Sequence, residues 1–193
     1  MQVCTRWLLF LIIALLLFSC QQAHQTDYEK LYAQKASEVT AYVLKNTPEC
    51  QCIMEPSRES FVRMAHQDQP EQDTMYIRQE IMQRLQMSRQ TALDSMIGLS
   101  TTYDLYQAVS DASVKIISRQ PLDTIQTARA YLRWIDSYGR QCPDGIYYIS
   151  KPIFNSDFIR VSFDIDLGGG CLPSYPKVLE LREDGWFCED CGW

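Results

Sequence analysis

Histidine is scarce in this sequence: the 193 residues include only two, His24 and His66. A zinc-protease helix carries two histidines in a His-Glu-x-x-His pattern, and neither histidine lies in one. A Ser-His-Asp triad could draw only on His66, because His24 lies in a polar stretch near the N-terminus. A Gly-x-Ser-x-Gly turn is also absent. These absences exclude the familiar hydrolase signatures.

The sequence also has fewer basic than acidic residues, and it has no glycine-rich loop of the phosphate-binding type. Lys and Arg number 18 against 24 Asp and Glu, which gives a formal charge of −6. Nucleic-acid binding is not expected, because a phosphate backbone attracts a basic patch. The glycines at 168–170 lead into Cys171-Leu172-Pro173 rather than into a helix, so they indicate a hairpin loop and not a phosphate cradle.

The first twenty residues differ in composition from the rest of the chain. Arg6 is the only charge before an apolar run from Trp7 to Phe18. A run of about 12 residues is too short to cross a bilayer and is typical of the hydrophobic region of a signal peptide. It ends in Leu17-Phe18-Ser19-Cys20, which resembles the lipobox of bacterial lipoproteins. The alternative is a plain secretory signal cleaved near Ser19 or Ala23.

The resemblance to a lipobox implies where the protein is located and how it is anchored. Cys20 would become the N-terminal residue and carry three acyl chains, palmitate among them. Gln21 in place of an aspartate favours the outer membrane in this family, and no acidic run follows that would indicate export to the cell surface. We therefore expect residues 1–19 to be a signal peptide, residues 20–25 a lipidated cysteine and tether, and residues 26–193 one soluble domain facing the periplasm.

The hydrophobic period changes near residue 140, from 3.6 residues to two. Residues 26–139 are expected to be helical and residues 140–193 to form strands. The predicted fold class is α+β, with about four N-terminal helices packed on a small C-terminal antiparallel β-meander. The longer helices are expected at 26–46, 73–98, 101–119 and 123–139, and the strands at 146–150, 158–167 and 178–182, with a tight turn at Asp184-Gly185.

Two apolar faces are expected to be buried. In the last helix, Ala128, Tyr131, Leu132 and Ile135 recur at helical spacing. In the segment 158–167, apolar and polar residues alternate, which predicts a strand with one buried face and one solvent-exposed face. The predicted buried residues are Val161, Phe163, Ile165 and Leu167, and the predicted exposed residues are Arg160, Ser162, Asp164 and Asp166.

The C-terminal part loosely resembles uncharacterised cell-envelope lipoproteins. The residues concerned are Ser150-Lys151-Pro152-Ile153-Phe154-Asn155, a strand, a turn of glycines and cysteine, another strand, and Asp184-Gly185-Trp186. This resemblance implies no activity.

Six cysteines remain once Cys4 and Cys20 are set aside: Cys50, Cys52, Cys142, Cys171, Cys188 and Cys191. An even number in an exported domain predicts disulfides, with the pairing left open. Two alternatives compete. Cys50, Cys52, Cys188 and Cys191 have spacings that zinc sites use, and Cys188-x-x-Cys191 is similar to a redox motif, although no helix can follow it to stabilise a thiolate.

Other candidate sites have a structural interpretation that we favour. Asp164 and Asp166 would pair with Arg182 or Lys177 across strands rather than form a carboxylate site. The C-terminal aromatic residues would form the core of the sheet rather than a binding groove. These residues are Tyr147, Tyr148, Phe154, Tyr175, Trp186 and Trp193.

The sequence thus predicts a lipid-anchored envelope protein that is not an enzyme, has no cofactor or metal, and serves as a binding or assembly module. Its acidic charge favours a basic envelope protein as partner. One alternative is an inhibitor or immunity-type protein acting on a toxin or lytic enzyme at the membrane. Another is an envelope hydrolase with an unfamiliar site around His66 or around Asp164 and Asp166.

Overall fold

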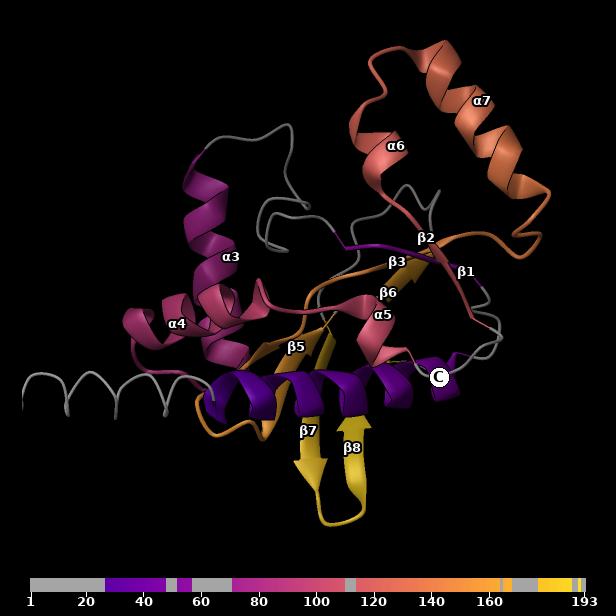
Figure 1. Ribbon diagram of the computed structural model, residues 1–193. Coiled ribbons are helices and arrows are strands. Elements are labelled where there is room, and N and C mark those ends of the chain that lie inside the picture. The colour runs from indigo at the N-terminus through magenta and orange to yellow at the C-terminus, as the bar shows by residue number, and fades with distance from the viewer. Residues whose placement is uncertain are drawn as a thin grey trace, which may run out of the picture.

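The computed structural model describes residues 27–47, 52–56, 71–109, 114–163, 165–167, 177–188 and 191. Together these residues form an α+β fold, which confirms the predicted class (Figure 1). The predicted signal peptide and tether lie outside the described residues, as does the lipidation site at Cys20. No helix in the described ranges combines the length and the apolar character needed to cross a bilayer.

Residues 27–46 are helical and form what we call the 27–46 helix, which runs along one side of the molecule (Figure 1). Its buried side chains recur at helical spacing. They include Tyr32, Ala36, Val39 and Val43. At the C-terminal end, the Asn46 side chain donates to the carbonyl oxygen of Tyr42 at 2.8 Å, and the helix stops before Pro48, where the sequence predicted its end.

The helix expected over 73–98 is two helices, α3 (Glu71–Arg84) and α4 (Gln90–Ser100). Gln86 has a φ of 55°, in the left-handed region. The Met87 N–H donates to the carbonyl of Met82 at 2.8 Å, and the Gln86 N–H to that of Gln83 at 3.1 Å. This is the Schellman pattern that ends many helices, formed here without the glycine that usually signals it.

The prediction of a single helix over residues 101–119 is wrong. Its first part forms only the short helix α5 (Leu105–Ala108), and its end forms strand β2 (Lys115–Ile117). Strand β1 (Cys52–Met54) lies in a segment expected to be a loop. The two pair in parallel, with Ile53 opposite Ile116, so tertiary pairing overrides the local helical period of residues 101–119.

The helix expected over 123–139 is α7 (Ala128–Gly139), which begins five residues later than predicted, and a separate short helix, α6 (Gln120–Asp123), precedes it. Thr127 caps α7, its hydroxyl accepting from the Ala130 N–H at 3.2 Å. α7 ends at Gly139, as predicted. In Figure 1 it stands at the upper right margin, on the opposite side of the molecule from α3 and α4.

The strands make two sheets instead of one meander. The first has the order β2-β1-β3-β6, in which β1 is parallel to β2 and to β3, and β6 is antiparallel to β3. The second has the order β4-β5-β7-β8 and is antiparallel throughout, so it corresponds to the predicted meander. The strands not yet located are β3 (Tyr147–Ile149), β4 (Ile153–Phe154), β5 (Arg160–Phe163), β6 (Ile165–Leu167), β7 (Lys177–Arg182) and β8 (Gly185–Cys188).

The single strand expected over 158–167 is divided between the two sheets, as β5 and β6. Ser162 is buried, although the alternation of residues predicted that it would be exposed to solvent. Arg160 instead pairs with Glu180 of β7, at 2.7 Å. Asp166 lies opposite Tyr148 of β3, in the first sheet, whereas Lys177 and Arg182 lie on β7 of the second sheet. Asp164 lies outside the described residues.

Both faces of the first sheet are covered, as parallel sheets require. Ile53 of β1 belongs to the main core, with the 27–46 helix and the second sheet. Its neighbours Cys52 and Met54 belong to a smaller core on the opposite face, with Trp134 of α7. The alternation of side chains along β1 therefore separates two hydrophobic cores.

Candidate functional site

Three parallel strands end at one edge of the first sheet, and each is followed by an ionisable residue. Glu55 follows β1 directly, while Arg119 and Lys151 lie two residues beyond β2 and β3. The register aligns Met54 with both Ile117 and Tyr148, which brings these ends together. The chain leaves β2 and returns as β3 on the other side of β1, so the loops diverge at this edge. In open α/β sheets, ligands bind at such a point.

A pocket of about 630 Å³ lies at this edge. The loops after β1, β2 and β3 line it, together with the start of α5. The lining residues are Glu55, Pro56, Tyr103, Asp104, Leu105, Tyr106, Arg119, Gln120, Thr124 and Lys151. We call it the strand-end pocket. Its volume falls in the range of small-molecule sites, roughly 300–1,000 Å³.

Glu55 joins the loops after β1 and β2. Its carboxylate accepts from the Ser118 hydroxyl at 3.0 Å and from the Arg119 N–H at 2.9 Å, and the Tyr106 hydroxyl bonds to it as well. Burial alone would raise the pKa of Glu55, but these hydrogen bonds hold the pKa below its ordinary value. Glu55 is therefore ionised at neutral pH and holds the pocket wall in place.

Asp104 has a similar structural task at the start of α5. Its carboxylate accepts from the Tyr106 N–H at 2.9 Å and from the Gln107 N–H at 3.4 Å, which caps the helix. Both carboxylates that line the pocket are thus bonded to main-chain N–H groups.

The pocket also contains two cationic side chains, Arg119 and Lys151. Partial burial lowers the pKa of the Lys151 amine, because a charged group loses hydration there. The pocket thus combines two cationic side chains with the carboxylates of Glu55 and Asp104, both of which accept hydrogen bonds from main-chain N–H groups.

The aromatic walls are Tyr103 and Tyr106. The Tyr103 hydroxyl lies 2.9 Å from that of Thr40 in the 27–46 helix, and burial raises its pKa. Tyr106 is more exposed, and its hydrogen bond to Glu55 raises its pKa. Both hydroxyls are therefore protonated at neutral pH.

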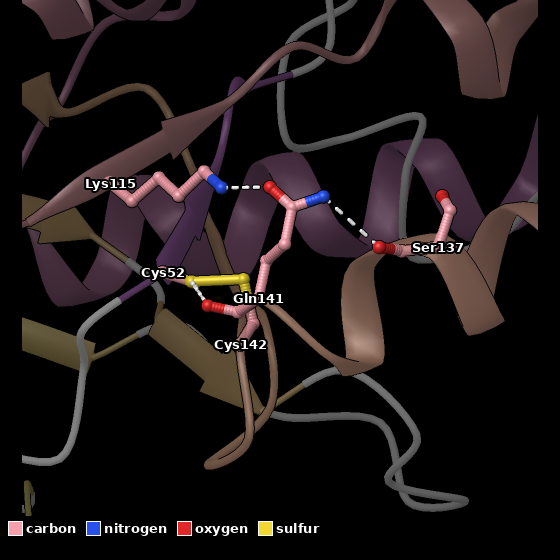
Figure 2. Close-up of a disulfide and its surroundings, with 5 residues drawn as sticks. All are labelled: Cys52, Lys115, Ser137, Gln141 and Cys142. Carbon is pink, nitrogen blue, oxygen red and sulfur yellow. Dashed lines mark hydrogen bonds between the residues drawn. A yellow bond between two sulfur atoms is a disulfide. The ribbon is translucent and has the colours of Figure 1, made fainter.

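The predicted cysteine sites are partly described. Cys52 of β1 and Cys142, just beyond α7, form a disulfide with Cα atoms 5.8 Å apart. Figure 2 shows this bond and its surroundings. The Cys52 sulfur lies 3.8 Å from the main-chain oxygen of Gln141, and the Gln141 side chain bridges Lys115 of β2 and the carbonyl of Ser137 in α7. α7 is thereby tied to β1 and β2.

Cys188, at the end of β8, is bonded to Cys191. The alternative zinc set does not form in this structure, because Cys52, Cys188 and Cys191 are all in disulfides. Cys50 and Cys171 lie outside the described residues. In the described ranges, no group of three or more His, Cys, Asp or Glu side chains is placed to hold a metal ion.

Most residues of the two sites named for the hydrolase alternative lie outside the described residues. His66 and Asp164 lie outside them, and Asp166 is described only by its place in β6 opposite Tyr148. Two of the C-terminal aromatic residues are core: Phe154 is fully buried and Trp186 is buried beside it. Tyr175 and Trp193 lie outside the described residues.

Sequence reasoning missed the strand-end pocket because it missed two of the three strands that build it. Each strand is only three residues long, too short to show a period of two. The available signals were Cys52-Ile53-Met54 before a proline, and the adjacent β-branched residues Ile116 and Ile117.

Comparisons with protein-family models, with curated proteins and with solved structures found no match to this chain.

Proposed function

We propose that this chain is a lipid-anchored cell-envelope protein whose soluble domain is a non-catalytic binding module, with the strand-end pocket as its ligand site. The observation that carries the proposal is the convergence of Glu55, Arg119 and Lys151 at the ends of three parallel strands. The anchor at Cys20 and the outer-membrane location come from the lipobox resemblance.

The ligand we propose is a small molecule or a chain end that carries a carboxylate. A guanidinium matches a carboxylate through two parallel hydrogen bonds, and a lysine amine adds a point charge. The rings of Tyr103 and Tyr106 provide apolar contact for the rest of the ligand. Glu55 and Asp104 fix the geometry of the walls and leave the recognition of charge to Arg119 and Lys151.

A matched pair of probes tests the pocket: N-acetylalanine, which presents a carboxylate on a short stem, and its primary amide, which does not. We expect saturable binding of the acid alone, measured by calorimetry. Arg119→Gln and Lys151→Met should each weaken binding about tenfold or more, because a hydrogen bond to a charged group contributes about 1.5–3 kcal/mol.

Arg89→Gln and Lys45→Met are the controls, since both side chains are exposed and neither lines the pocket. They should leave binding unchanged. Equal binding of the acid and the amide, or equal loss in the control variants, would contradict the proposal. Failure of the acid to bind at all would also count against it.

The anchor has its own test in the intact mass of membrane-extracted protein. We expect the mass of a triacylated chain that begins at Cys20. Alkylation after reduction should then label four cysteines that are not labelled before reduction, namely those of the two described disulfides. Labelling of Cys50 and Cys171 is counted separately. An unlipidated chain would remove the anchor without affecting the pocket.

A further inference from the structure

The apolar stripe of α7 faces outward. Sequence periodicity predicts that Tyr131, Leu132 and Ile135 face the core, yet their exposed fractions are 41%, 61% and 40%. Ala128, one turn earlier on the same stripe, is exposed too. The buried residue of α7 is Trp134, at 8%. The helix is therefore rotated so that the side chains of Leu132 and Ile135 are exposed, while the partly exposed ring of Tyr131 stacks on that of Trp134 with their centroids 6.2 Å apart.

The rotation of α7 is fixed by the contacts of Trp134 and Tyr138 and by a disulfide just beyond the helix. Trp134 packs with Tyr138, their ring centroids 5.0 Å apart, and both contact the smaller core. Two residues beyond the C-cap, Cys142 is bonded to Cys52 of β1. Turning the Leu132 stripe inward would expose Trp134, so the outward stripe is a stable feature of the fold.

Positive charge borders this stripe. Arg129 and Arg133 lie one turn apart on one flank of α7, and Arg140 is its C-cap residue. Asp136 is the single acidic residue of the helix. Within a chain of net charge −6, α7 is a local basic element. An apolar stripe with arginines along its edge is the pattern of helices that lie in the surface of an anionic membrane.

We propose that α7 docks on a lipid bilayer that contains anionic lipids. Tyr131, Leu132 and Ile135 would enter the boundary between headgroups and acyl chains, while Arg129 and Arg133 reach the phosphates. The position of α7 at the margin of the molecule leaves it accessible to a flat surface (Figure 1). This surface is separate from the strand-end pocket and does not depend on lipidation of Cys20.

A second copy of the chain is a poorer occupant. Stable protein interfaces bury about 800 Å² per partner, and a 12-residue helix that offers three large apolar side chains supplies only part of that. Antiparallel pairing through the stripe would also bring the arginines of both copies to one rim, with a single Asp136 from each copy to offset them. A bilayer with negative headgroups meets the same stripe without that repulsion.

Hydrogen exchange of the full chain tests the proposal with a readout confined to α7. The protein is compared on vesicles of phosphatidylcholine alone and on vesicles with phosphatidylglycerol in equal part. We expect the α7 amides to become protected only on the anionic vesicles. Arg129→Gln together with Arg133→Gln should lower the docked fraction relative to the undocked about 30-fold, because each basic residue strengthens such binding about fivefold.

Matched controls separate this docking from loss of the fold and from the anchor. Lys45→Gln with Arg89→Gln removes the same charge from exposed sites elsewhere, and Ile159→Gln matches Leu132→Gln at a side chain of 45% exposure. Leu132→Gln should weaken the protection and the controls should keep it. Equal protection of the α7 amides on both vesicle types would overturn the proposal, and so would no protection on either type. Protection without vesicles would also overturn it, if it grows with protein concentration or appears when an acidic protein is added.

Discussion

Replacing Cys52 and Cys142 together by alanine is expected to lower the free energy of unfolding by about 4–5 kcal/mol. The bond joins residues 90 apart, and the chain-entropy account of a cross-link gives a value of this size for so long a loop. Since most domains have only about 5–15 kcal/mol of stability, the variant should be close to unfolding. Urea denaturation under non-reducing conditions measures the difference.

The matched control is the double replacement of Cys188 and Cys191, which lie three residues apart. The same account gives a loss of only about 2 kcal/mol for this short loop. Losses of equal size in the two variants would contradict the assignment of the long-range bond to Cys52 and Cys142.

Phe154→Ala should be the most damaging single substitution in the core, with a loss of about 3–5 kcal/mol. Phe154 is fully buried, and its ring centroid lies 5.6 Å from that of Tyr32, 5.4 Å from Phe158 and 6.0 Å from Trp186. Its removal leaves a cavity at the junction of the 27–46 helix and the second sheet, again measurable by urea denaturation.

Phe187→Ala provides the comparison for Phe154→Ala, because Phe187 lies on β8 but is 39% exposed. The Phe187 ring is covered by the guanidinium of Arg182, 3.7 Å from its centroid, a contact of about 0.5–1 kcal/mol at an exposed site. Its loss should stay well below that of Phe154→Ala. A reversed order would mean that the aromatic residues of the C-terminal third do not pack as a core.

Elements with strong local signals were predictable. Local backbone preferences explain three of these features. They are the end of the 27–46 helix before Pro48, the end of α7 at Gly139 and the hairpin between β7 and β8. At the hairpin, Gly185 has a φ of 119°, which few other residues adopt. The fold class followed from the change of hydrophobic period near residue 140.

Elements that depend on distant partners were not predictable in the same way. β1 and β2 carry three residues each and become strands because they pair with one another and, for β1, with β3. The candidate site could not be predicted for the same reason, because Arg119 and Glu55 become neighbours only when β1 and β2 pair. For α7, the period correctly indicated an amphipathic helix, but Trp134 and the bond at Cys142 decide which face turns inward.

The central position of β1 has a consequence for how the chain assembles. β1 ends at Met54, while its partners are β2 at residues 115–117 and β3 at 147–149. As the chain is made from its N-terminus, β1 has no neighbouring strand until about a further third of the sequence has followed, and β3 comes later still. Parallel pairings across such separations form slowly, since much chain entropy is lost before the first contact. The first sheet, and the pocket at its edge, are therefore expected to complete late in folding, after the 27–46 helix and the β7–β8 hairpin have formed locally.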